Sequence, residues 1–397
     1  MQVNLTDTPD FDTPTDRRNT LCQKWDGAPR LFGVSADSSL PMWVADTDFR
    51  APDVVQEALQ RMVDHGIYGY MGDYGPYKAA IKWWMAERHD WEIEEDWILT
   101  TFGLVNAIGI ALDVFTGPDD GIITFTPVYH AFARMVNASG RQLVELPLAR
   151  DGDIYVMDFD AYEKQLTGKE KMILLCSPHN PGGRVWTRQE LEELADFARR
   201  HDLMIIADEI HQDLVFPGEK HTAFGLLENV ADRLITLSAT SKTFNLAGHH
   251  TGNAIIPNPE IRRAFSKRLS ALGLSTTMAG IHAATAAYSP RGANWADAQM
   301  RYLDENRQVF DAGIQAIPGL KSMPMQATYL AWVDFSGTGM EEREVIERLE
   351  KTADIAANHG RSFGKGGETY MRFNIGTQRS RIEEALRRLQ SAFGDLQ

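Results

Sequence analysis

Seven short apolar runs alternate with polar or amphipathic segments between residues 97 and 256. Short runs that are apolar throughout are typical of strands buried on both faces of a parallel sheet. The segments between them are long enough to hold crossover helices, so the pattern predicts an α/β fold with a mostly parallel, seven-stranded sheet. The runs are WILTT (97–101), GIITF (121–125), RQLVEL (141–146), MILLC (172–176), LMIIA (203–207), RLITLS (233–238) and GNAII (252–256).

Helix signals occur between these runs. Residues 52–65 place their apolar side chains on one face and end at Gly66, a residue type that commonly terminates helices. Thr187 and Glu190 have the spacing of a capping box before an amphipathic run that continues to residue 202. These patterns predict helices that cover the faces of the sheet.

The pattern changes near residue 290, where helical and strand-like segments follow one another without the earlier crossover spacing. We therefore expect a large domain over residues 49–288 and a smaller α+β domain over 289–397. The expected elements of the smaller domain are helical 301–316, strand 328–334, helical 341–357, strand 370–375 and a final helix over 380–393.

Composition limits the classes of function. A chain of 397 residues with 43% apolar content can bury a large core and exceeds the usual length of one domain. Cys22 and Cys176 are too few for a disulfide framework and lack zinc-ligand spacing, so we expect a cytoplasmic protein without a metal site. The polar N-terminus and the absence of a bilayer-length apolar run argue against a membrane protein. The net charge of -15 argues against nucleic acid as a partner.

Three side chains that follow predicted strands suggest a specific chemistry. Lys242 lies in SATSKTFNLAG, Asp208 in ADEIHQD and Asn180 in SPHNPGG. A lysine amine can condense with an aldehyde, an aspartate can keep a pyridine nitrogen protonated, and an asparagine can hydrogen-bond a ring hydroxyl. Taken singly, the lysine is typical of a surface residue and the aspartate of a turn. The ordered set predicts a site for pyridoxal phosphate at the carboxyl edge of the sheet.

The phosphate of such a cofactor needs backbone donors. Gly103, Leu104 and Val105 form a turn between the WILTT strand and an apolar helix, and the free N–H groups of a helix start favour a phosphate. Without Lys242 the same turn would be an ordinary strand-to-helix connection. Hydroxyl donors near the lysine are expected from Ser238, Thr240 and Ser241.

A substrate carboxylate is bound best by a planar donor, which arginine supplies. Arg372 lies inside the predicted strand MRFNI, where an unpaired arginine would be costly, and it is our candidate for this role. The pair His249-His250 could suggest a metal site. Adjacent residues on an extended chain point to opposite faces, however, and no further ligand spacing accompanies them.

Across nearly its whole length the chain resembles the fold-type-I pyridoxal phosphate enzymes, and within them the MalY/PatB branch of cystathionine β-lyases and C–S lyases. The motifs that carry the resemblance are PMWVADTDF, HGIYGY, TPVYHAF, LLCSPHNPGGRVW, ADEIHQDLVF, SKTFNLAG and MRFNIGTQRSRIEEAL. The aspartate motif of the wider aminotransferase family usually carries tyrosine three residues later, whereas the lyase branch has histidine, as at His211.

The resemblance implies further site residues and an assembly. Tyr129 would stack on the cofactor ring, although it could also be a core tyrosine, and Tyr70 would reach the phosphate of a partner subunit in a homodimer. His211 would lie beside the cofactor. Ala45 and Asp46 would line the substrate pocket, and the segment 1–48 would pack against the small domain.

Several positions depart from the family pattern, which leaves the identity of the substrate open. Ala239 stands where many members have a phosphate-binding serine, and His249 stands where the lyase branch commonly has leucine. The remaining departures are Asn106, Met71-Gly72-Asp73 and Gly376-Thr377-Gln378.

The expected activity is β-elimination from an L-cysteine S-conjugate, with Lys242 as the base at Cα and thiol, pyruvate and ammonia as products. An aminotransferase of class I/II is the main alternative, since it would use the same residues. A regulatory protein that retains the cofactor and docks another protein is a third hypothesis, against which the intact residue set argues.

Overall fold

A computed structural model describes residues 9–395, so the first eight residues of the expected N-terminal segment lie outside the described part. The largest sheet has seven strands in the order β2-β10-β9-β8-β7-β3-β4. Within this sheet β10 runs opposite to the other strands. The strands of the sheet are β2 (Ile98–Thr101), β3 (Gly121–Thr126), β4 (Gln142–Pro147), β7 (Glu170–Cys176), β8 (Met204–Asp208), β9 (Leu234–Ser238) and β10 (Gly252–Ile255). The seven predicted strands and the mostly parallel sheet are confirmed.

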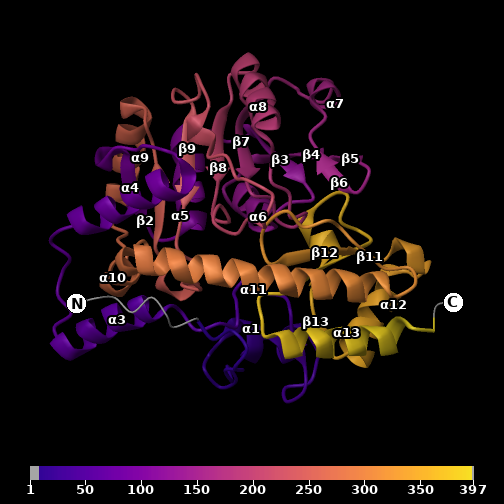
Figure 1. Ribbon diagram of the computed structural model, residues 1–397. Coiled ribbons are helices and arrows are strands. Elements are labelled where there is room, and N and C mark those ends of the chain that lie inside the picture. Colours follow the sequence, from indigo (N-terminus) through magenta and orange to yellow (C-terminus); the bar gives the residue numbers. More distant parts are fainter. Residues whose placement is uncertain (1–8, 396–397) are drawn as a thin grey trace.

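Helices cover this sheet and bury two apolar clusters against it (Figure 1). The strands β3 and β9 are buried along their whole lengths, which explains why their sequences are apolar runs rather than alternating patterns. The surrounding elements are α3 (Asp53–His65), α4 (Gly75–His89), α5 (Leu104–Phe115), α6 (Ala131–Ala138), α7 (Phe159–Glu163), α8 (Arg188–Arg200), α9 (Pro259–Ala271), α10 (Met278–Ala287) and the hairpin β5 (Ala149–Asp151) and β6 (Ile154–Val156).

Two local predictions about helix ends are confirmed. Thr187 accepts a hydrogen bond from the backbone of Glu190, whose side chain accepts one in return from Thr187, which completes the capping box of α8. The second prediction concerns Gly66. Helix α3 ends there, and Gly66 adopts the left-handed conformation.

A four-stranded antiparallel sheet of order β11-β12-β15-β14 forms the second layer. Figure 1 shows the long helix α11 between the large sheet and α13. The elements are α11 (Pro290–Gln315), β11 (Lys321–Ser322), β12 (Leu330–Asp334), α12 (Glu342–Glu347), β14 (Asn358–His359), β15 (Tyr370–Asn374) and α13 (Arg379–Phe393), with α1 (Gln23–Asp26) and α2 (Ala28–Phe32) nearby in the N-terminal segment. The domain boundary near residue 288 stays a prediction.

The expected helix over 341–357 is wrong in its second half. The chain forms α12, a π-helical turn over Arg348–Thr352, and then β13 (Ile355–Ala356). Asp354 has a φ of 55°, which ends the helix. Strand β13 pairs in parallel with β1 (Leu40–Pro41) of the N-terminal segment, so the consecutive apolar residues are buried by a distant partner.

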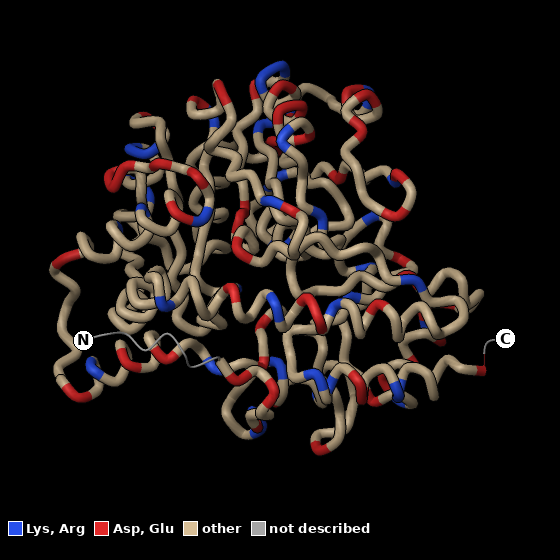
Figure 2. The backbone as a smooth tube through the Cα atoms, in the orientation of Figure 1, with Lys and Arg blue, Asp and Glu red and all other residues tan. Residues whose placement is uncertain are grey.

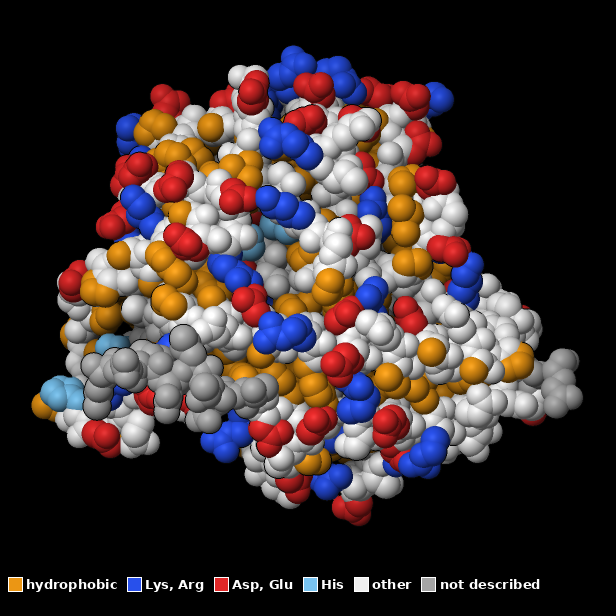
Figure 3. Space-filling model, viewed as in Figure 1, with side chains coloured by type: hydrophobic (Ala, Val, Ile, Leu, Met, Phe, Trp, Pro, Cys, Tyr) orange, Lys and Arg blue, Asp and Glu red, His pale blue; other side chains and the backbone are white. Residues whose placement is uncertain are grey.

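Charged residues lie mainly on helices and loops, and the face viewed in Figure 3 mixes acidic with basic side chains among the described residues (Figures 2 and 3). Within residues 9–395, no helix has both the length and the apolar character needed to cross a membrane.

Candidate active site

The carboxyl ends of β8 and β9 bring a buried carboxylate and a buried amine together. Asp208 is the last residue of β8, and Lys242 follows the end of β9. The Asp208 side chain accepts one backbone hydrogen bond, of 3.2 Å from Ile210 N–H. Burial raises the pKa of Asp208 to about 6, although the nearby Lys242 ammonium opposes this shift. A carboxylate with so few donors is suited to accept a hydrogen bond from a cationic ring nitrogen.

Lys242 is held at one point in this pocket. Its Nζ donates a 2.6 Å hydrogen bond to the carbonyl oxygen of Ala45. Burial lowers the pKa of Lys242 to about 8, with Arg372 adding to the shift and Asp46 and Asp208 opposing it. The amine therefore loses its proton more easily than an ordinary lysine does, as a nucleophile or a general base requires.

Arg372 is buried on β15, and its guanidinium is directed toward the large sheet by three acceptors. Its nitrogens donate to Asn180 Oδ1 at 2.9 Å, to the Trp43 carbonyl at 2.7 Å and to Asn358 Oδ1 at 2.5 Å. The guanidinium also lies 4.9 Å from the ring centroid of Phe363. Its Nε has no partner, and burial lowers the pKa of Arg372 to about 10. Among residues 9–395 no carboxylate pairs directly with this cation, so it is suited to bind an anionic ligand.

Aromatic rings from the turn after β3 lie near Arg372. Burial, with the Asp208 carboxylate, raises the pKa of Tyr129, while Arg372 opposes the shift. The adjacent His130 packs edge to face with Phe363 at 5.6 Å, and its Nδ1 is buried without a partner. Burial and the cations Arg372 and Arg134 lower the pKa of His130 to about 4, so its imidazole is neutral at physiological pH.

The turn before α5 presents free backbone donors. Gly103 is the N-cap of α5 with φ 83° and ψ 165°, and no side chain caps the helix. These dihedral angles are accessible to glycine almost alone, and a Cβ built there would meet no atom within 4 Å. The N–H groups of Leu104 and Val105 lie in the first turn of α5, where a helix supplies no acceptor of its own. Ser238 Oγ is fully buried without a hydrogen-bond partner.

Other hydroxyls predicted for the phosphate lie in the loop after β9. Thr240 is buried, and Ser241 is half-buried next to Lys242. Ala239 is buried as well and supplies no donor, as its sequence departure implied.

The departure Asn106, and His250 beside the departure His249, contact the same turn. His250 stacks on Phe102 with a centroid distance of 4.8 Å and an interplanar angle of 3°. Asn106 accepts a 3.3 Å hydrogen bond from Phe102 N–H through its Oδ1. Through Phe102, the residue before Gly103, both side chains help to fix the position of the Gly103 turn.

The departure at residues 376–378 lies behind the segment 44–48, which we call the pocket strip. The Gly376 carbonyl accepts a 2.8 Å hydrogen bond from Asp48 N–H, and Gln378 Nε2 donates one of 3.0 Å to the Asp48 carbonyl. Gly376 and Gln378 therefore fix the backbone of the pocket strip at Asp48.

His211 is buried within the site, whereas Tyr70 is exposed on the surface. His211 is buried with its Nδ1 unpartnered, and its ring packs edge to face against Tyr329 at 6.3 Å. Tyr70, by contrast, has a relative exposure of 104% and makes no contribution to the site of its own chain. Its expected reach into a partner subunit stays a prediction.

Four further residues surround the site without having been predicted from the sequence: Phe363, Asn358, Asn374 and Tyr329. Asn358 is the register partner of Arg372 on the neighbouring strand, so its role depends on the pairing of β14 with β15. Asn374, two residues after Arg372 on β15, donates to the Val44 and Asp46 carbonyls. The clustering of asparagines and aromatic residues around MRFNI was a signal, but it did not indicate which backbone each would meet.

Comparison with known proteins identifies the family. Residues 45–389 match the family described as aminotransferase class I and II. The chain belongs to this family. It is 38% identical to the cystathionine beta-lyase PatB of Bacillus subtilis strain 168, over 96% of this chain and 99% of that protein. It is 31% identical to the protein MalY of Escherichia coli strain K12, over 96% of this chain and 98% of that protein.

A solved structure gives the same result for the fold. Cystalysin from Treponema denticola, which contains pyridoxal 5'-phosphate, superimposes with a TM-score of 0.93 at 37% identity, over 98% of this chain and 100% of that one. The fold is therefore that of the pyridoxal phosphate-dependent aminotransferases, as the resemblance implied.

The residues of this chain fit that cofactor. The pocket combines a lysine amine whose pKa is lowered, a buried carboxylate with a single backbone donor, and a glycine turn at the start of a helix that no side chain caps. The unpartnered, buried Ser238 Oγ and His211 Nδ1 provide further polar atoms for a ligand. When bound, pyridoxal phosphate supplies an aldehyde and an electron-accepting pyridine ring.

Proposed function

We propose that this protein is a pyridoxal phosphate-dependent C–S β-lyase that converts an L-cysteine S-conjugate and water into a thiol, pyruvate and ammonia. The observation that carries this proposal is the Lys242 amine, whose pKa is lowered by burial and which feels the charges of both Asp208 and Arg372. The choice of a lyase is supported by DEIH with His211 and by 38% identity, over nearly the full length of both chains, to a protein named cystathionine beta-lyase.

Each residue has a distinct task in this reaction. Arg372 binds and orients the α-carboxylate of the substrate through its guanidinium. Asp208 would accept a hydrogen bond from the ring nitrogen of the bound cofactor and hold that nitrogen protonated. Lys242, as the free amine, removes the Cα proton, and the Cβ–S bond breaks as the thiolate leaves. Water completes the conversion to pyruvate and ammonia, and no external oxidant or reductant is needed.

Aminotransfer is the second candidate, because residues 45–389 match a family described by that activity. It would use the same Lys242, Asp208 and Arg372, with Lys242 moving the Cα proton without loss of a thiolate from the substrate. It requires a keto acid as the acceptor of the amino group, which a β-lyase does not.

The assembly we propose is a homodimer with composite sites. Apolar side chains are exposed on and after the end of α3, where Ile67 and Tyr68 have relative exposures of 68% and 63% beside the fully exposed Tyr70. Exposed apolar residues grouped in this way are typical of an interface. Tyr70 would then supply its hydroxyl to the phosphate site of the partner.

The experiment that tests the proposal follows pyruvate and thiol during incubation of the cofactor-loaded protein with L-cystathionine and simpler cysteine conjugates, without a keto acid. Sustained release of both products is expected. Lys242→Ala is the matched control, in which release should stop while the protein stays folded.

A further inference from the structure

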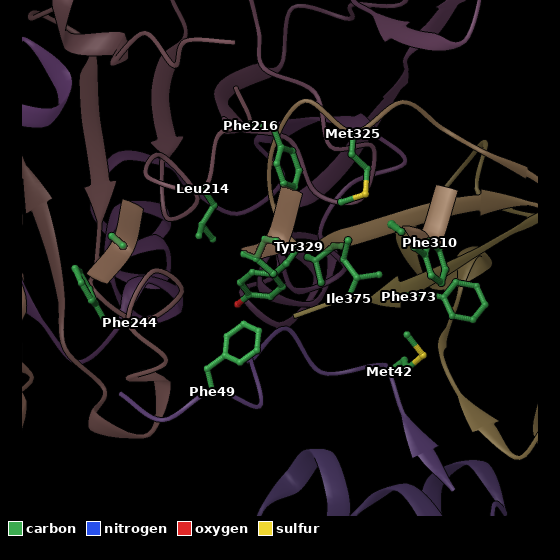
Figure 4. Close-up of a cluster of buried hydrophobic side chains, with 14 of the residues drawn as sticks. Met42, Phe49, Leu214, Phe216, Phe244, Phe310, Met325, Tyr329, Phe373 and Ile375 are labelled. Carbon is green, nitrogen blue, oxygen red and sulfur yellow. The ribbon is translucent and has the colours of Figure 1, made fainter. Parts of the chain in front are cut away.

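The carbonyl oxygen of Ala45 receives two hydrogen bonds from opposite parts of the chain. Lys242 Nζ donates at 2.6 Å, and the Tyr329 hydroxyl donates at 3.1 Å. Tyr329 is fully buried, and Figure 4 shows it in the apolar cluster near Phe49 and Ile375. Its hydroxyl and the lysine amine therefore share one acceptor inside the pocket.

The position of that acceptor is fixed by neighbouring side chains. Asn374 Nδ2 donates to the carbonyls of Val44 and Asp46, both at 2.6 Å. The chain bends here, with Asp46 N–H donating to the Val44 carbonyl at 2.9 Å, and this bend leaves the carbonyl of Ala45 free to accept from Lys242 and Tyr329. Asn245, three residues after Lys242, holds the following carbonyls of Thr47 and Phe49 at 2.9 and 3.0 Å.

Tyr329 is also held in place by its backbone. The preceding Thr328 has a φ of 71°, which is rare for a β-branched residue. Its N–H donates to the Leu214 carbonyl at 2.7 Å, and its hydroxyl accepts from Leu330 N–H at 3.1 Å. A conformation of this kind persists only where the surroundings determine it, and here it directs the tyrosine toward the pocket strip.

We propose that Tyr329 is a positioning residue for Lys242, with its hydroxyl and the free lysine amine sharing the Ala45 carbonyl during the reaction. When the amine moves to the substrate, Tyr329 keeps the buried carbonyl hydrogen-bonded. When the amine returns, it meets an acceptor that is already polarised by the hydroxyl, so the ammonium form is favoured less than it would be by an unshared carbonyl. The proposal rests on the proposed function only in that Lys242 is the base.

Other groups around the lysine contribute to its charge state and stay constant in the test. Asp46 comes from the pocket strip, Asp208 from β8 and Arg372 from β15. His211, from the loop after β8, is kept neutral by burial, with Lys242 and Arg372 lowering its pKa further.

Tyr329→Phe removes only the shared hydroxyl. The matched control is Tyr162→Phe, since Tyr162 is also buried and donates to a backbone carbonyl, that of Pro147, at 3.1 Å far from the site. In the full-length protein freed of cofactor, the pH dependence of reductive methylation at Lys242, followed by peptide mass spectrometry, gives the lysine pKa. Tyr329→Phe should raise it by about half a unit or more, and Tyr162→Phe should leave it unchanged.

Steady-state kinetics of the cofactor-loaded variants give the second readout. Tyr329→Phe should lower kcat about tenfold with little change in KM, because the base is misplaced while substrate binding is intact. An unchanged lysine titration would overturn the proposal, even if kcat fell, since a loss of kcat alone fits a general structural role. If the wild-type protein released no pyruvate but the lysine titration shifted as expected, the proposed function would fail and the role of Tyr329 would stand.

Discussion

Arg372 and Asn180, which lie 192 positions apart, are joined by a 2.9 Å hydrogen bond from the guanidinium to Oδ1 of the amide. The arginine belongs to the four-stranded sheet, and the asparagine lies in the loop after β7 of the seven-stranded sheet. One contact thus couples the residue proposed to bind the substrate carboxylate to the one proposed to bind the cofactor ring. Binding of the substrate and orientation of the cofactor should therefore depend on each other.

Replacement of Arg372 by lysine tests this coupling. Lysine keeps the charge but cannot reach Asn180, Trp43 and a substrate carboxylate with one planar group. Loss of one charge-assisted hydrogen bond corresponds to an increase of about 10- to 100-fold in the KM for a cysteine conjugate. Steady-state kinetics check this value, with Arg361→Lys as the control because Arg361 is exposed and paired with Glu342. A KM equal to that of the wild type would remove Arg372 from the substrate site.

Asp208→Asn should slow catalysis and stabilise the cofactor-free protein. Burial raises the pKa of Asp208 from the ordinary 3.8 to about 6, so the folded state holds this proton more tightly than the unfolded state. The stability of the wild-type protein should therefore fall as pH rises from about 4 to 6, and the cost should persist above that range. A shift of this size corresponds to about 3 kcal/mol, of which we expect about 1–3 kcal/mol to be recovered in the variant at pH 7.5.

Thermal or urea unfolding at pH 7.5 and at pH 4 measures that effect. The advantage of Asp208→Asn should vanish at the lower pH, whereas the exposed Asp202→Asn should show no such dependence. With cofactor, turnover should fall by about two orders of magnitude or more, as when one preorganised electrostatic partner is lost. Equal stability of variant and wild type at pH 7.5 would contradict the claim that burial destabilises the ionised Asp208 carboxylate.

Gly103→Ala tests the phosphate turn. At φ 83° and ψ 165° alanine is strained by about 1–3 kcal/mol, although its Cβ meets no neighbour. If the turn relaxes, its N–H groups no longer converge, and cofactor affinity should fall at least about tenfold. Cofactor titration measures the affinity. Gly140→Ala is the matched control, because Gly140 also has positive φ and open space but lies in the exposed turn after α6.

Composite sites predict complementation between one impaired and one inactive variant. Tyr70→Phe should weaken binding of the cofactor phosphate in the partner, and Lys242→Ala should abolish turnover in its own chain. After mixing and subunit exchange, a hybrid dimer has one site with both residues intact. Activity should then recover toward about a quarter of the wild-type value, for random pairing of equal amounts with one good site in each hybrid. No recovery despite hybrid formation would place Tyr70 outside the partner's site.

The strands of the large sheet were predictable because their burial is recorded locally, as runs such as GIITF and MILLC that are apolar on both faces. The capping box of α8 was predictable for the same reason, since Thr187 and Glu190 contact each other. The segment 341–357 failed because β13 depends on β1, more than 300 residues away, and a helical pattern gives no information about that pairing.

The candidate site shows the same division between local and distant causes. The motifs around Lys242, Asp208, Asn180 and Arg372 indicated the chemistry, and the fold brings these residues to one pocket. The acceptor of the lysine could not be predicted, because it is the backbone carbonyl of Ala45, which any residue would supply. The role of Tyr329 was equally hidden, since a buried tyrosine at a strand start is usually a core residue.

The most direct test of the account is product analysis with the purified, cofactor-loaded protein, L-cystathionine and a panel of simpler cysteine S-conjugates, in the absence of any keto acid. We predict continuous release of pyruvate and thiol over many turnovers, with the cofactor absorbance retained and no release by Lys242→Ala. A single bleaching of the cofactor, with turnover only after a keto acid is added, would contradict the β-lyase and identify an aminotransferase on the same scaffold.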